Sequence, residues 1–225
     1  MSPRATMLGR QAALTSVLAS IYFFGAAIAT HLVNRQYDPV SDYISDYAVG
    51  PWGWIYGSAF WASCVGCFAL ALSLTLLVPA TSLSRIGVVL LVIVGASFAI
   101  DFFYPTDILP PGAPPKAIVG TIHLVDALFG WVLFTVSAVL LSSRLKNDAY
   151  WKPWHRLLIS LAWLSALLFI VLVGVVVSKV PFGGIAEKAF ILDRNIWALV
   201  VSVLAFNSPA GPQVSIKTET AVMFF

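Results

Sequence analysis

The chain alternates between long apolar runs and short segments that hold its charges, prolines and glycines. Each run is long enough for a helix that crosses a bilayer, which takes about 20 residues. The runs cover Gln11 to Val33, Trp52 to Val78, Arg85 to Tyr104, Ala117 to Leu141, Arg156 to Ser178 and Gly184 to Phe206. The pattern predicts an all-α fold, a polytopic bundle of six transmembrane helices in one domain over residues 1–206. Residues 207–225 are expected to form a disordered cytoplasmic tail.

Composition supports the membrane assignment and excludes two other classes. Hydrophobic residues make up 60% of the chain and charged residues 10%, whereas a soluble domain has about 25% charged residues. A disordered chain would show the opposite balance. The first run follows Arg4 and Arg10, as in a secretory signal peptide. Its apolar stretch from Ala12 to Ala29 is longer than the usual 7–15 residues of such a signal, which favours an uncleaved helix.

Lysine and arginine fall mostly on one side of the predicted helices. With the N-terminus inside, the inner segments hold Arg4, Arg10, Arg85, Arg144, Lys146, Lys152, Arg156 and Lys217, and the outer loops hold Arg35, Lys116 and Lys179. Positive residues favour the cytoplasmic side, so we expect both termini inside and a multi-pass protein of the bacterial cytoplasmic membrane. Aromatic residues at helix ends, including Tyr56 and Trp151, are expected at the membrane interfaces. The bases form no groove-sized patch, so no nucleic-acid partner is expected.

The first outer loop, from Asn34 to Tyr47, combines acids with an apolar pattern. Asp38 before Pro39 is typical of a helix start. Apolar residues then recur at helical spacing, at Val40, Tyr43, Ile44 and Tyr47. The pattern predicts a short amphipathic helix on the outer surface, with three aspartates on one side, Asp38, Asp42 and Asp46. A solvated acidic face, a divalent-cation site and a polar lid over a pocket are the alternative interpretations.

The second outer loop, from Pro105 to Lys116, holds five prolines in twelve residues. Proline ends the preceding helix and favours extended, stiff backbone, so this loop is expected to form a short rigid cover. Thr106 and Asp107 would lie at its root, close to Asp101 at the end of the third run.

Ionisable residues inside the runs are the most specific feature, because each costs about 2.5–3.5 kcal/mol at the bilayer centre. With a rise of about 1.5 Å per residue, Asp126 and Arg194 both lie about 14 Å below the outer boundary. Equal depth predicts a buried ion pair between them. The alternative is a sixth helix broken or shallow around Asp193 and Arg194. The ionisable set is Asp101, His123, Asp126, Glu187, Lys188, Asp193 and Arg194.

His123 and Asp126 are three residues apart on one predicted helix face. A histidine with a carboxylate partner can act as a general base, a proton relay or a metal ligand. A hydrogen-bonded structural histidine is the alternative. Cys64 and Cys67 are also three residues apart, but inside an apolar helix they are expected to serve packing rather than redox or metal chemistry.

Several short motifs occur along the chain in one order: Ser41-Asp42-Tyr43-Ile44-Ser45, Gly50-Pro51 with Trp54, Phe103-Tyr104-Pro105-Thr106-Asp107, Gly120-Thr121-Ile122-His123 and Gly184-Ile185-Ala186-Glu187-Lys188. Together they resemble the bacterial six-helix membrane proteins grouped as domain of unknown function 998 (DUF998). The resemblance covers about Leu14 to Phe206. It implies six helices and a shared outer site made of Asp42, Ser45, Pro105, Thr106, Asp107 and His123. The chain departs from the family at Asp193 and Arg194 and in its tail.

Three functions fit these patterns. The first is a non-catalytic membrane subunit, sensor, or protein that binds a small ligand or lipid, with ligand-binding candidates Asp42, Ser45, Asp46, Asp101, Thr106, Asp107 and His123. The second is an enzyme acting on a lipid or amphiphile, with His123, Asp126 and Asp107 as catalytic candidates. The third is a small proton-coupled transporter. No cofactor is predicted, although a divalent cation would suit the carboxylates. The lipid bilayer is the expected partner, with a lipid or small amphiphile and a homo-oligomer as further candidates.

Overall fold

A computed structural model of the protein describes residues 2–108 and 117–209, and the described residues form helices joined by turns. The membrane-length helices are α1 (Pro3–Val33), α2 (Gly53–Leu77), α3 (Arg85–Phe103), α4 (Ile118–Leu145), α5 (His155–Val177) and α6 (Gly183–Phe206). Two short 3₁₀ helices accompany them, η1 (Ile44–Ala48) and η2 (Lys152–Trp154). All six long helices have the length and apolarity to span a membrane, which confirms the predicted class of multi-pass membrane protein.

The observed bounds differ from the predicted ones at identifiable signals. α1 begins before the predicted Gln11, because the Ser2 hydroxyl accepts a hydrogen bond from the Ala5 amide and Pro3 fits the first helical turn. α6 runs without a break through Asp193 and Arg194. The alternative of a broken sixth helix is therefore wrong. The predicted tail falls mostly outside the described residues.

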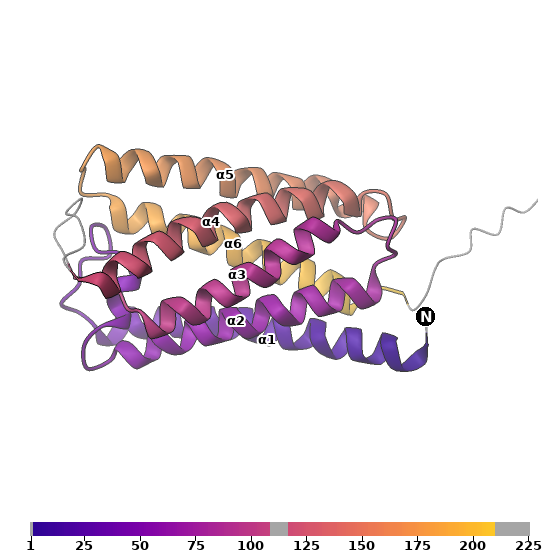
Figure 1. The fold of residues 1–225 in the computed structure, drawn as a ribbon, viewed down its shortest axis with the longest axis horizontal. Coiled ribbons are helices and arrows are strands. Elements are labelled where there is room, and N and C mark those ends of the chain that lie inside the picture. Colours follow the sequence, from indigo (N-terminus) through magenta and orange to yellow (C-terminus); the bar gives the residue numbers. More distant parts are fainter. Residues whose placement is uncertain (1, 109–116, 210–225) are drawn as a thin grey trace, which may run out of the picture.

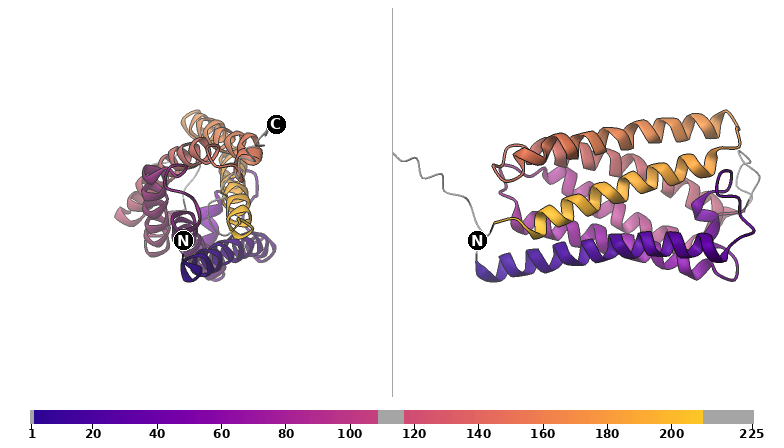
Figure 2. Two further views of the ribbon diagram at one scale, coloured as in Figure 1. Left: turned by 90° about the vertical axis from the view of Figure 1, so that its right-hand side faces the viewer. Right: turned by 180° about the vertical axis from the view of Figure 1, so that it is seen from behind.

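The helices form a closed ring in which each packs against its neighbours in sequence, and α6 returns to pack against α1. Figure 1 shows the bundle from the side, and the left view of Figure 2 shows the ring along its long axis. α1 begins and α6 ends at the same end of the bundle (Figure 1). We name this the terminal end. The opposite end, which holds residues 34–52, is the distal end.

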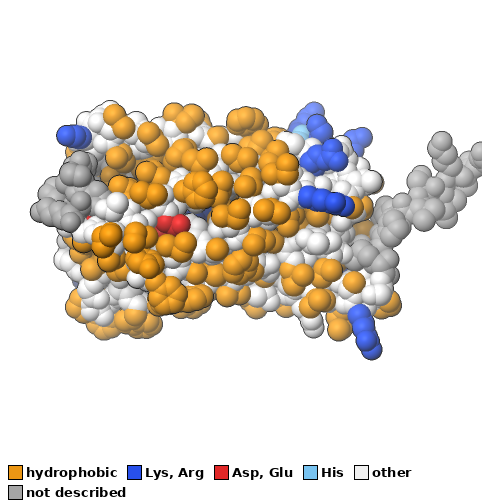
Figure 3. All heavy atoms as spheres, in the orientation of Figure 1, with side chains coloured by type: hydrophobic (Ala, Val, Ile, Leu, Met, Phe, Trp, Pro, Cys, Tyr) orange, Lys and Arg blue, Asp and Glu red, His pale blue; other side chains and the backbone are white. Residues whose placement is uncertain are grey.

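Apolar side chains cover the outside of the bundle, and aromatic ones fill its inside. On the face in Figure 3 a broad apolar band separates the two ends, and most lysine and arginine side chains gather at the terminal end. Inside the ring, Trp197 is fully buried and its indole N–H donates to the Ser142 hydroxyl at 3.0 Å. Tyr56 and Trp151 are also buried. Both side chains therefore contact other parts of the protein, and their position at the membrane interfaces stays a prediction.

Candidate functional site

The segment from Asp38 to Ala48, which we name the latch segment, is a chain of turns that ends in η1. The Asp38 carboxylate accepts hydrogen bonds from the Val40 amide at 3.1 Å and the Ser41 hydroxyl at 2.8 Å. The Asp42 carboxylate accepts one from the Asp38 amide at 2.7 Å. The predicted amphipathic helix is therefore wrong. Aspartate side chains that bond the nearby backbone stabilise turns in place of a helix.

The latch segment packs onto the first turn of α6. The amide of Gly184 donates to the carbonyl of Ser41 at 3.2 Å, and the amide of Ile185 donates to that of Val40 at 3.0 Å. The first amides of a helix have no partner within the helix itself. The latch segment supplies those partners, so the start of α6 and the first loop form one hydrogen-bonded unit.

Two charged side chains of α6 complete this attachment. The Glu187 carboxylate accepts a hydrogen bond from the Ile44 amide at 2.5 Å. The Lys188 ammonium donates to the carbonyls of Pro39 at 3.1 Å and Asp42 at 2.6 Å. Both side chains form hydrogen bonds with backbone groups of the latch segment. The contact between α6 and the latch segment therefore depends on the backbone conformation of that segment as well as on its side chains. The sequence motifs around Ser41 and Gly184 thus meet in space.

Asp46 is the buried acid of the latch segment. Its side chain is 6% exposed, and its carboxylate accepts a hydrogen bond from the Tyr43 amide at the start of η1. Burial raises the pKa of Asp46 to about 6, and the nearby Asp42 charge acts in the same direction. The Tyr43 amide and the charge of Lys188 oppose that rise.

The raised pKa of Asp46 predicts that the latch segment holds more tightly in acid. The folded protein binds this proton more strongly than the unfolded chain, so the stabilisation is complete below about pH 4 and is lost as pH rises through 6. We expect protection of the latch amides against hydrogen exchange to be about tenfold higher at pH 4.5 than at pH 7.5. Asp46→Asn should reduce this difference, because asparagine binds no proton over this pH range. An equal pH dependence in both proteins would contradict the role of Asp46.

A small cavity with several polar side chains in a mostly apolar lining lies beneath the latch segment, with a volume of about 20 Å³. We name it the distal cavity. Ile44 and Ser45 of the latch segment line it, together with residues of all the membrane-length helices except α5. Its polar lining consists of Ser45, Tyr56, Asp101, His123, Glu187 and Arg194. A volume of this size accommodates a water-sized molecule.

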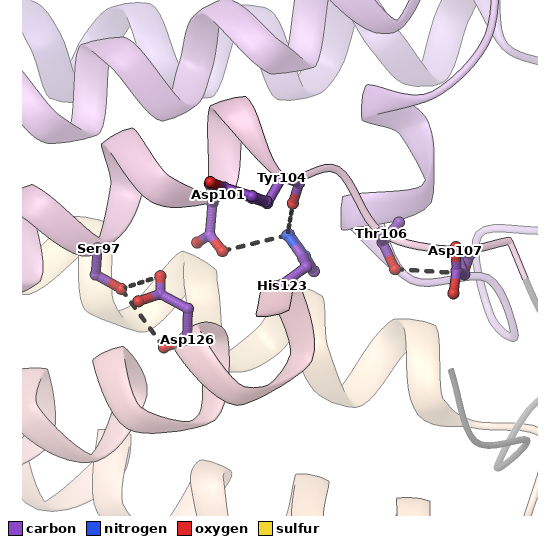
Figure 4. Close-up of polar contacts among 7 residues, drawn as sticks. All are labelled: Ser97, Asp101, Tyr104, Thr106, Asp107, His123 and Asp126. Atoms are coloured by element: carbon purple, nitrogen blue, oxygen red, sulfur yellow. Dashed lines mark hydrogen bonds and ion pairs between the residues drawn. The ribbon is translucent and has the colours of Figure 1, made fainter. Parts of the chain in front are cut away.

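Asp101 of α3 and His123 of α4 face each other at this cavity (Figure 4). His123 Nδ1 lies 2.9 Å from the Tyr104 carbonyl oxygen and 3.2 Å from Asp101 Oδ1. A carbonyl only accepts, so the hydrogen bond to Tyr104 places a proton on Nδ1. The other ring nitrogen, Nε2, then remains for a ligand or a second proton. Both side chains are buried.

The expected ion pair between Asp126 and Arg194 is not formed within residues 2–108 and 117–209. Asp126 accepts a hydrogen bond from the Ser97 hydroxyl at 2.6 Å, between α4 and α3 (Figure 4). The Arg194 guanidinium instead lies over the Phe98 ring, 4.4 Å from its centroid. Asp193 accepts a hydrogen bond from Ser165 of α5. Equal depth in the membrane is therefore not enough to predict an ion pair, because the two side chains leave their helices in different directions.

Thr106 and Asp107 lie apart from the Asp101–His123 pair (Figure 4). The Asp107 carboxylate accepts a hydrogen bond from the Ala117 amide at 2.9 Å, which joins the two described ends of the second loop. The Thr106 hydroxyl donates to the Asp107 carbonyl at 3.3 Å. The expected rigid cover falls mostly on residues 109–116, outside the described residues.

The structure thus distributes the sequence candidates over several places. Ser45, Asp101 and His123 line the distal cavity, Asp42 and Asp46 belong to the latch segment, and Thr106, Asp107 and Asp126 lie elsewhere. Sequence reasoning missed Tyr56, which looked like an interfacial residue, and the attachment roles of Glu187 and Lys188. The motif Gly184 to Lys188 was the available signal for the last two. Among the described residues, no group of three or more His, Cys, Asp or Glu side chains is arranged to hold a metal ion.

Comparison with known proteins gives one match. A family model described as "Protein of unknown function (DUF998)" matches residues 17–204. No curated protein and no solved structure matches the chain.

Proposed function

Because the chain belongs to the DUF998 family, whose description names no activity, we propose its function from its own side chains: a non-catalytic membrane protein that binds a small polar ligand in the distal cavity. The observation that carries this proposal is the position of Asp101, His123, Glu187 and Arg194 around one cavity directly beneath the latch segment. Ionisable groups inside a membrane protein are costly and mark functional sites. The latch segment would release from α6 when the ligand enters.

The distal end would face the outside of a bacterial cytoplasmic membrane. The concentration of lysine and arginine at the terminal end supports this orientation, since positive residues favour the cytoplasmic side. A ligand would then arrive from outside and meet the latch segment first.

Ligand binding is favoured over catalysis on an amphiphile by the size of the cavity. About 20 Å³ suits a small polar species, whereas an acyl chain would need the helices to separate. The Asp101–His123 contact then serves to orient the imidazole toward the ligand.

Release of the latch segment can be measured with a cysteine in its inner face. Ser45→Cys is expected to react slowly with the permanently charged reagent 2-(trimethylammonium)ethyl methanethiosulfonate, added to the outside of intact cells, because Ser45 is half-buried and lines the small distal cavity. Adding Lys188→Met removes both hydrogen bonds from Lys188 to Pro39 and Asp42. We expect the reaction to become about tenfold faster, as the loss of charge-assisted hydrogen bonds predicts.

Controls separate opening of the latch segment from general unfolding. Lys179→Met removes an exposed positive charge at the same end of the bundle and should leave the rate unchanged. Equal rates with and without Lys188→Met would contradict a latch held by this side chain. Modification only after permeabilisation of the cells would contradict the proposed orientation.

A further inference from the structure

A second small cavity lies next to the distal cavity on the other side of Arg194. Its volume is also about 20 Å³, and α1, α2 and α6 supply most of its lining. We name it the midspan cavity, because α2 and α6 meet there near the middle of their lengths. Its polar lining consists of Ser16, Ser20, Ser63, Cys67, Arg194 and Asn195. Unlike the distal cavity, it is lined by no carboxylate among the described residues.

Arg194 carries a charge into this interior without a direct ion pair among the described residues, although Asp101 and Glu187 share the distal cavity with it. The side chain is 4% exposed, and no described acid lies within salt-bridge distance of it. Its described contacts are with aromatic faces, 4.4 Å from the Phe98 centroid and 6.0 Å from those of Phe23 and Phe134. A guanidinium has five N–H donors and no acceptor. A buried cation of this kind is stabilised by an anion that occupies the adjacent space.

Ser63 supplies a second, independent sign of a missing partner. Its hydroxyl oxygen is buried in α2 and has no hydrogen-bond partner among the described residues, although it borders the midspan cavity. Buried hydroxyls are nearly always hydrogen-bonded. An acceptor inside the cavity would satisfy both Ser63 and Arg194.

We propose that the midspan cavity binds one monovalent anion of halide size, of which chloride is the biological example. Donor groups with positive charge and no lining carboxylate select an anion rather than a cation. The volume suits one species of about the size of water, which favours a halide over a larger tetrahedral oxyanion such as phosphate. The site is separate from the latch segment, so it goes beyond the ligand proposed for the distal cavity.

Thermal unfolding of the purified protein in chloride-free buffer tests the site. Sodium chloride, titrated against sodium gluconate at constant ionic strength, is expected to raise the Tm along a saturable curve. Bromide should act like chloride, and phosphate should not. Broadening of the ³⁵Cl NMR line by the protein gives a second reading of the same binding. A Tm that depends on ionic strength but is equal in chloride and gluconate, without line broadening, would overturn the proposal and leave water as the occupant.

Two serine variants provide the matched comparison. Ser63→Ala should bind chloride about tenfold more weakly, as the loss of one hydrogen bond to a charged group predicts. Ser73 is a buried hydroxyl of the same helix that also lacks a partner but does not line the cavity. Ser73→Ala should keep the chloride affinity of the wild type. Equal weakening in both serine variants would overturn the role of Ser63. A folded Arg194→Gln variant should show no effect of chloride on the Tm.

Discussion

Replacing Gly184 with alanine is expected to detach the latch segment from α6. A Cβ atom at this position would overlap the backbone nitrogen, carbon and oxygen of Asp42. Backbone cannot move aside as a flexible side chain does, so the segment must shift as a unit. The shift would break the hydrogen bonds from Gly184 to Ser41 and from Ile185 to Val40. Overpacking of this kind costs about 1–3 kcal/mol.

Hydrogen exchange and thermal unfolding measure this result. In Gly184→Ala the latch amides should lose about tenfold or more of their protection, and the Tm should fall by several degrees, about 2–8 °C. Gly174→Ala is the matched control, because a Cβ at Gly174 in α5 meets nothing within 4 Å. That variant should be as stable as the wild type or slightly more stable, since alanine favours a helix. Unchanged latch protection in Gly184→Ala would contradict the observed docking.

Glu187→Ala is expected to produce the second large loss. The change removes the carboxylate that accepts a hydrogen bond from the Ile44 amide. Ile44 is 4% exposed and packs in the core. A buried donor left without a partner costs about 1–3 kcal/mol, and the shortened side chain also enlarges the distal cavity. We expect a lower Tm and rapid hydrogen exchange at Ile44.

Glu187→Gln distinguishes the hydrogen bond from the charge. Glutamine keeps a carbonyl oxygen that can accept from Ile44, so this variant should retain most of the protection at that amide. If glutamine and alanine are equally damaging, the negative charge of Glu187 matters more than its hydrogen bond. Arg194 would then be an expected source of the attraction, since it lines the distal cavity together with Glu187.

The positions of the helices followed from the sequence because a spanning helix needs a continuous apolar run. Such a run ends where charges, proline and glycine gather, as at Arg85, which begins α3, and Pro105, which follows it. The start of α1 was misplaced, because the charged residues Arg4 and Arg10 lie within the helix beyond its apolar part. Local capping by Ser2 determined that end.

The latch segment shows where a sequence pattern misleads. Apolar spacing from Val40 to Tyr47 fits a helix, but the aspartates offer the backbone local hydrogen bonds that compete with one. The carbonyls of Val40 and Ser41 also find partners in α6, far away in sequence. No local pattern could reveal that second contact.

The sequence alone determined the membrane class, the helix number and the family resemblance, because these depend on apolar runs and on short motifs read in order. Depth along a helix also follows from residue number, which correctly placed Asp101 and His123 near one end. Only the tertiary structure decided the partners, because the direction of a side chain depends on how each helix is rotated in the ring. Rotation directs Asp126 toward Ser97 and Arg194 toward the aromatic interior, and so leaves that arginine between two small cavities.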